Sequence, residues 1–124
     1  MPKSFLVVGG SSDIGLLLCD LLLDKGYTLT VVARDATRVE SIKSRGANVI
    51  VGDALDSEVI SSAITKTLEL GEGSITGVAH LVGSIMLRPP HALKLEAFED
   101  VIQTNLISAF LTLSLTGKAM LKTG

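Results

Sequence analysis

The sequence predicts an α/β fold, a doubly wound parallel sheet of about four strands with helices on both faces. Two observations carry this prediction. Short apolar segments rich in β-branched residues alternate with segments of helical periodicity, as is typical of parallel sheets with right-handed crossovers. The chain also has 124 residues, of which 47% are hydrophobic and 19% charged, which is enough for one domain with an ordinary core.

The first half of the chain contains two predicted strands and two predicted helices. Residues 5–8 form a continuous apolar run closed by glycines, as in a strand buried on both faces. Residues 14–25 carry two leucine triplets and end at a glycine, which predicts a largely covered helix. Residues 28–33 are rich in β-branched side chains and predict the second strand. Residues 35–45 are polar and predict a surface helix.

The second half repeats this alternation. Residues 48–51 predict a third strand, and residues 57–70 predict a helix with one apolar side. Residues 78–82 predict the fourth strand, after which the prolines at positions 89 and 90 interrupt regular structure. A last helix is expected to begin near position 95 and to run to about position 122.

The composition excludes several classes of protein. Lysines and arginines number 11 and acidic residues 13, and this net charge of −2 argues against nucleic acid as a partner. The lone cysteine, Cys19, excludes an internal disulfide framework and favours a reducing compartment. No stretch approaches the roughly 20 apolar residues of a membrane span, and the N-terminal apolar segment is too brief for a secretory signal. We therefore expect a cytoplasmic protein without a membrane partner.

A glycine turn follows the first predicted strand, in the segment VGGSSDIG at residues 8–15. A turn between a strand and a helix can direct backbone N–H groups at a pyrophosphate, and glycines permit positive φ and close backbone approach. The GxGxxG pattern is not satisfied, and a tight turn without a ligand is the alternative. The segment resembles the TGxxxGxG signature of the short-chain dehydrogenase/reductase family. This resemblance implies a Rossmann-like, NAD(P)-binding domain over residues 1–124.

The match to that signature has two departures. The matching residues, expected to bind the cofactor, are Gly9, Ser11, Ser12, Ile14 and Gly15. Val8 replaces the threonine of the signature, and Asp13 replaces its middle glycine. Asp13 could cap the following helix. Its carboxylate also belongs to the predicted cofactor site, where it would weaken phosphate binding unless it points away.

Arg34 directly follows the second predicted strand, at the place where dinucleotide-binding folds contact the adenosine ribose. In the family, an aspartate that selects NAD would be expected at Ala33, and an arginine that selects NADP at Arg34. The sequence has the second arrangement, so we expect NADP(H) as the cofactor, with NAD(H) as the less favoured choice. Asp35 could pair with Arg34 or repel the phosphate, and an arginine that is merely solvated is the alternative.

Two further matches follow the third and fourth strands. Asp53 and Ala54 resemble the family's Asp-Val/Leu pair, which implies contacts to the adenine; the alternative for Asp53 is a turn residue. Where the family carries Asn-Asn-Ala-Gly, this chain keeps only Gly83, and His80 takes the place of the first asparagine. His80 could supply a hydrogen bond to the cofactor, and a structural histidine at a strand end is the alternative.

Asn105 lies in a segment of the last predicted helix that resembles the family's segment ending in an active-site asparagine. The resemblance implies that Asn105 is catalytic and helps to hold a water in a proton relay. The alternative is a buried asparagine bonded to a neighbouring carbonyl, since a buried amide must be satisfied.

The remaining catalytic groups of the family, a serine and a Tyr-x-x-x-Lys pair, have no match. The one tyrosine, Tyr27, is followed four residues later by Val31. Three interpretations remain: the cofactor-binding half of an NADP(H)-dependent oxidoreductase that is catalytically incomplete, a free-standing nucleotide-binding or interaction module, or a complete enzyme that uses His80 or His91. The first is preferred, and we expect no turnover of common carbonyl substrates.

Two apolar surfaces predict self-association. If the sheet ends at its fourth strand, the unpaired edge of that strand invites another chain. The last helix is apolar on more than one face and therefore needs cover. We expect a homo-oligomer that covers one of these surfaces.

Overall fold

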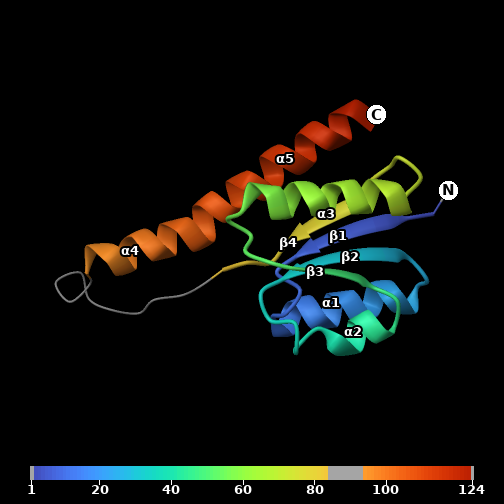
Figure 1. The fold of residues 1–124 in the computed structure, drawn as a ribbon, viewed down its shortest axis with the longest axis horizontal. Coiled ribbons are helices and arrows are strands. Elements are labelled where there is room, and N and C mark those ends of the chain that lie inside the picture. The colour runs from blue at the N-terminus through green and yellow to red at the C-terminus, as the bar shows by residue number, and fades with distance from the viewer. Residues whose placement is uncertain (1, 84–93, 124) are drawn as a thin grey trace.

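The structure is a computed structural model that describes residues 2–83 and 94–123 (Figure 1). Its strands form a parallel sheet in the order β3-β2-β1-β4, which confirms the predicted α/β, Rossmann-like fold class. The strands of the described residues are β1 (Ser4–Val8), β2 (Thr28–Ala33), β3 (Asn48–Val51) and β4 (Gly77–His80). The helices are α1 (Asp13–Asp24), α2 (Glu40–Ser44), α3 (Ser57–Leu70), α4 (Leu95–Ile102) and α5 (Ser108–Thr123), with a π-helical turn, η2 (Gln103–Ile107), between the last two.

Helices cover both faces of the sheet, with α3 and α5 on one side and α1 and α2 on the other (Figure 1). Successive side chains of a strand point to opposite faces, so β1 contributes to two cores. Leu6 and Val8 belong to the core under α3, together with Ile60. Val7 belongs to the core under α1, together with Cys19. The prediction that the first strand is buried on both faces is therefore confirmed.

Ser4 ties the beginning of β1 to two distant segments. Its backbone N–H donates to Thr76 Oγ1 at 2.9 Å, and its hydroxyl donates to the carbonyl oxygen of Thr67 at 2.7 Å. These contacts span 72 and 63 residues of sequence, and Ser4 is fully buried. The end of α3 and the segment before β4 are thereby fixed to the first strand.

The second helix is shorter than predicted. The sequence pattern predicts a helix over residues 35–45, but the helix is confined to Glu40–Ser44. Asp35 Oδ1 accepts hydrogen bonds from the backbone N–H groups of Thr37 at 3.0 Å and Arg38 at 3.4 Å. Asp35 thereby closes a turn, and residues 36–39 continue as turns before the helix begins at Glu40.

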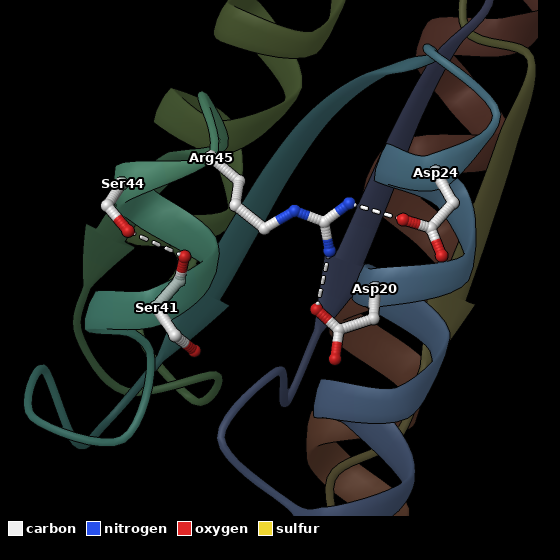
Figure 2. Close-up of polar contacts among 5 residues, drawn as sticks. All are labelled: Asp20, Asp24, Ser41, Ser44 and Arg45. Carbon is white, nitrogen blue, oxygen red and sulfur yellow. Dashed lines mark hydrogen bonds and ion pairs between the residues drawn. The ribbon is translucent and has the colours of Figure 1, made fainter.

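Arg45 follows α2 and joins it to α1 (Figure 2). Its guanidinium donates to Asp24 Oδ1 at 2.5 Å and to Asp20 Oδ1 at 2.8 Å, one helical turn apart on α1. The hydrogen bond to Asp24 is the main cause that raises the pKa of Arg45. Because all three side chains are exposed, the contact orients α2 more than it stabilises the fold.

The last two elements differ from their predicted bounds. The fourth strand is Gly77–His80, so it begins one residue earlier and ends two residues earlier than predicted. The single helix expected over residues 95–122 is interrupted at Gln103–Ile107 by the π-helical turn. The predicted interruption at Pro89 and Pro90, and His91, lie outside the described residues. Among the helices of the described residues, none is both long and apolar enough to cross a membrane.

Candidate functional site

A cavity of about 290 Å³ opens at the carboxyl ends of the strands, where ligands bind in open α/β sheets. Half of the residues predicted to bind the cofactor or act in catalysis lie on its wall. These residues are Gly9, Ser11, Ser12, Arg34, Ala54 and Gly83. The other predicted residues do not line the cavity. They are Asp13, Ile14, Gly15, Asp53, His80 and Asn105.

The glycine turn packs tightly against the exit of β4. Gly9 has φ of +93°, and a Cβ there would lie 2.8 Å from the carbonyl carbon of Leu81 and 2.9 Å from the backbone nitrogen of Val82. A Cβ at Gly15 would lie 2.5 Å from the carbonyl oxygen of Gly9. Both glycines are therefore required by close backbone approach, and the wall of the cavity is backbone at this point.

Ser12, and not Asp13, caps the first helix. Ser12 Oγ accepts from the backbone N–H of Gly15 at 3.0 Å and donates to the carbonyl oxygen of Gly9 at 3.2 Å. The capping role predicted for Asp13 is wrong, because Ser12 already occupies the N-cap with extended backbone angles. Asp13 begins the helix instead and is 95% exposed.

Two arginines line the cavity beside the glycine turn. Arg34 is in the predicted place, and Arg38, which the motifs do not predict, lies in the turn before α2. The guanidinium of Arg38 donates to Asp13 Oδ1 at 2.7 Å. The Asp13 carboxylate is therefore paired with a cation and exposed to solvent. Asp35, the other carboxylate in question, bonds backbone N–H groups of its own turn.

Of the two predicted site residues after β3, Ala54 lines the cavity and Asp53 stabilises a turn. Ala54 is buried and lines the cavity. Asp53 Oδ1 accepts from the backbone N–H of Leu55 at 2.9 Å, which is the geometry of a turn residue. The side chain of Asp53 therefore fits its structural alternative, and the adenine contact predicted for it stays a prediction.

His80, at the end of β4, faces helix α5. Its Nδ1 lies 3.0 Å from Thr112 Oγ1, and its Nε2 lies 3.2 Å from Ser108 Oγ. Burial lowers the pKa of His80. Both ring nitrogens are thus engaged by hydroxyl groups of the helix, and the structural alternative for His80 describes this geometry. Its cofactor role stays a prediction.

Asn105 lies in the π-helical turn, beside the fourth strand's exit. Its Nδ2 donates to the carbonyl oxygen of Val101 at 3.0 Å, and a Cβ at Gly83 would lie 3.0 Å from its Oδ1. The preceding residue, Thr104, lines the cavity; it lies in the segment that resembles the family's but is not among the predicted site residues. The predicted catalytic asparagine is therefore adjacent to the cavity, although it is not part of the wall. Within the described residues, no cluster of three or more His, Cys, Asp or Glu side chains could hold a metal ion.

The chain matches a known family along its sequence. The family model of the short chain dehydrogenases covers residues 3–124. A curated relative, D-threitol dehydrogenase of Mycolicibacterium smegmatis, is 26% identical over 131 residues. That match covers 98% of this chain and 49% of the relative, so the chain spans about half the length of the curated relative that it matches.

Solved structures match the same half. A short-chain type dehydrogenase/reductase of Mycobacterium ulcerans has a TM-score of 0.87 at 21% identity, covering 98% of this chain and 48% of that one. A short-chain dehydrogenase/reductase of Serratia marcescens has a TM-score of 0.82 at 22% identity, covering 95% and 51%. The structure of ElxO with NADP bound has a TM-score of 0.83 at 20% identity, covering 98% and 52%. At these identities, the likeness shows the shared fold.

Proposed function

This chain belongs to the short-chain dehydrogenase family, and we propose that its cavity binds NADP(H) as the cofactor-binding half of an oxidoreductase. The observation that carries the proposal is the pairing of a backbone-walled glycine turn with two arginines on one cavity. The first feature suits a pyrophosphate, and the second suits a further phosphate on the ribose. We also propose that residues 1–124 form one domain.

The pyrophosphate would lie against the glycine turn. The cavity reaches Ser11 and Ser12 at the N-terminus of α1, where unpaired backbone N–H groups and the helix dipole favour an anion. Gly9 leaves the wall without a side chain, so a phosphate can approach the backbone. Gly15 lies against the turn, since a Cβ there would lie 2.5 Å from the carbonyl oxygen of Gly9, and Ile14 is 71% exposed.

The 2′-phosphate of NADP(H) would lie between Arg34 and Arg38. Guanidinium groups bind phosphate through charge-assisted, often bidentate hydrogen bonds. Asp13 holds Arg38 by an ion pair and is itself 95% exposed, so it can hold that arginine beside the cavity without occupying it. NAD(H) lacks this phosphate and would gain little from either side chain.

The other end of the cavity would receive the adenine and the nicotinamide. Ala54, on the loop after β3, would contact the adenine, while Gly83 and Thr104 would lie toward the nicotinamide. When bound, the nicotinamide supplies or accepts a hydride. Asn105 would be the catalytic residue that this chain contributes. The family's serine and Tyr-x-x-x-Lys are not among these 124 residues, so we propose no turnover of carbonyl substrates by them alone.

Titration of the chain with NADPH and NADH, followed by nicotinamide fluorescence, tests the proposal. We expect saturable binding, with a Kd for NADPH at least about tenfold below that for NADH because of the added charge-assisted contacts. Neither 2′-phospho-ADP-ribose nor ADP-ribose contains nicotinamide. A comparison of how strongly each competes therefore measures the contribution of the 2′-phosphate alone. No saturable binding of either cofactor would refute the proposed function, and tighter binding of NADH would refute the choice of NADP(H).

Self-association is the second part of the proposal. The described sheet ends at β4, and the last helices present exposed apolar side chains. Exposed examples are Leu95, Phe98, Leu106, Phe110 and Leu113. A homo-oligomer would cover these surfaces. A cytoplasmic location, predicted from the lone cysteine, also stays a proposal.

Light scattering with a matched pair of variants tests this part. Phe110 on α5 is 64% exposed, and Val51 on the opposite edge of the sheet is 55% exposed. We expect a mass of at least twice 13.0 kDa at micromolar concentration. Phe110→Glu should lower the mass because it buries a charge in the interface, whereas Val51→Glu should leave it unchanged. A monomer, or an equal effect of both variants, would contradict the assignment.

A further inference from the structure

A chain of hydrogen bonds runs from β4 to the wall of the cavity. The His80 ring lies between Thr112 Oγ1, 3.0 Å from Nδ1, and Ser108 Oγ, 3.2 Å from Nε2. The Ser108 hydroxyl in turn donates to the carbonyl oxygen of Thr104, which lines the cavity. Ser108 and Thr112 are fully buried. No water is therefore needed to link the ring to the residue on the wall.

The direction of each bond fixes the tautomer of the ring. A carbonyl oxygen can only accept, so the single hydroxyl hydrogen of Ser108 is used on Thr104. Ser108 Oγ must then accept from His80, which places the ring hydrogen on Nε2. In a neutral ring Nδ1 is then an acceptor, and the Thr112 hydroxyl donates to it.

The same serine lies where the helix changes its hydrogen-bond pattern. The backbone N–H of Ser108 donates to the carbonyl oxygen of Gln103, five residues back, as in a π-helix. In an α-helix that N–H would donate to Thr104, four residues back. The Ser108 hydroxyl therefore donates to the Thr104 carbonyl in place of the Ser108 backbone N–H, which donates to Gln103 instead.

We propose that His80 is a positioning residue for the cavity. With its hydrogen on Nε2, the ring directs the Ser108 hydroxyl onto the Thr104 carbonyl and so holds the π-helical turn at Gln103–Ile107. That turn puts Thr104 on the cavity wall and Asn105 against Gly83. The effect on the turn stands by itself, and the effect on cofactor affinity rests on the proposed function.

The environment of the ring is polar but uncharged. Helix α5 presents the hydroxyls of Ser108 and Thr112, and β1 presents Val8 as the register partner of His80. Burial is the cause that lowers the pKa of His80, and no charged group of the described residues contributes. Protonation would place a hydrogen on Nδ1 and turn the Thr112 hydroxyl from donor to acceptor. The hydrogen on Nε2 that bonds Ser108 is present in both protonation states, so protonation would change the Thr112 contact and leave the link to the turn intact.

Two buried hydroxyls that contact the same ring give a matched test. Ser108→Ala breaks the link to Thr104, whereas Thr112→Val removes a hydroxyl of equal burial that does not lead to the turn. In the unliganded chain, we expect amide hydrogen exchange at residues 103–107 to accelerate about three- to tenfold in Ser108→Ala. In Thr112→Val, the ratio between exchange rates at the turn and in the rest of α5 should equal that of the wild type.

His80 itself is tested by NMR and by two substitutions. Nitrogen-15 spectra of the wild-type ring should show the hydrogen on Nε2. His80→Gln keeps an N–H donor toward Ser108 and should retain slow exchange at the turn. His80→Leu has no donor and should exchange as fast as Ser108→Ala. A ring hydrogen on Nδ1, or equal acceleration in Ser108→Ala and Thr112→Val, would overturn the proposal.

Cofactor affinity separates this inference from the proposed function. If the wild type binds NADPH, Ser108→Ala should weaken binding about three- to tenfold, and Thr112→Val should not. If the wild type binds no NADPH, the proposed function fails, while ring NMR and exchange at the turn still decide the role of His80. Unchanged affinity in Ser108→Ala, with accelerated exchange, would limit His80 to the stability of the turn and overturn its role at the cavity.

Discussion

Replacement of Gly9 by alanine is expected to abolish NADPH binding and to lower the free energy of unfolding by about 2–4 kcal/mol. Two effects add. A φ of +93° is unfavourable for any residue with a side chain, and the new Cβ would lie under 3.0 Å from backbone atoms of Leu81 and Val82. Because these atoms belong to the backbone, a rotamer change cannot relieve the contact. The glycine turn would have to move away from Leu81 and Val82, and all three residues line the cavity.

Urea unfolding and NADPH titration of the same variant measure both effects. Gly26→Ala is the matched control, since Gly26 also has a positive φ, +77°, but a Cβ there would have no atom within 4 Å. The control should lose about 1–2 kcal/mol from backbone strain and keep wild-type affinity. Equal losses of stability in the two variants would mean that close approach at Gly9 contributes nothing. Unchanged NADPH affinity in Gly9→Ala would refute the proposal that the pyrophosphate binds at the glycine turn.

Arg34→Ala should weaken NADPH binding by about ten- to a hundredfold and change NADH binding by less than about twofold. The reason is that Arg34 lines the cavity with a cation, and of the two cofactors only NADPH carries the 2′-phosphate that we propose it contacts. Arg38→Ala should act in the same direction, because Arg38 lies on the same wall. Fluorescence titration with the two cofactors measures both variants.

Arg45→Ala is the control for a general loss of positive charge. Arg45 is bound to Asp20 and Asp24 at the end of α2 and is not part of the cavity wall (Figure 2). Its removal should leave both affinities unchanged. An equal loss of NADPH and NADH affinity in Arg34→Ala would sink the assignment of this arginine to the 2′-phosphate.

The fold could be predicted because apolar periodicity reports burial directly. Strands buried on both faces appear as continuous apolar runs, and β2 has the predicted bounds for that reason. The edge strand β3 also has the predicted bounds, although it is only half-buried. The helix predicted over residues 35–45 is partly wrong because residues 36–39 form turns that begin with hydrogen bonds to Asp35, contacts that periodicity does not record. The π-helical turn at Gln103–Ile107 leaves the composition of the helix unchanged, so nothing in the apolar pattern marks it.

The residues of the cavity wall are predictable where the backbone forms the wall. They are less predictable where side chains form it. Gly9 and Gly83 are fixed by the strand ends that they follow, and both line the cavity. His80 is assigned by its place in a motif, but its direction depends on a helix that follows almost 30 residues later, as the hydrogen bond to Ser108 shows. Arg38 and Thr104 reach the wall through a turn and a π-helical segment, and neither of these local structures is marked in the apolar pattern.

The position of β1 has a consequence for the order in which the chain folds. β1 pairs with β2 over a short crossover, but its other neighbour, β4, is joined through contacts such as the one from Ser4 to Thr76, 72 residues away. Closing so long a loop costs more entropy than pairing strands that are near in sequence, and distant contacts slow folding. During synthesis, β1, β2 and β3 also leave the ribosome before β4 exists. The half of the sheet that ends at β3 therefore forms first, and the addition of β4, which completes the cavity with Leu81 and Val82, is the late step.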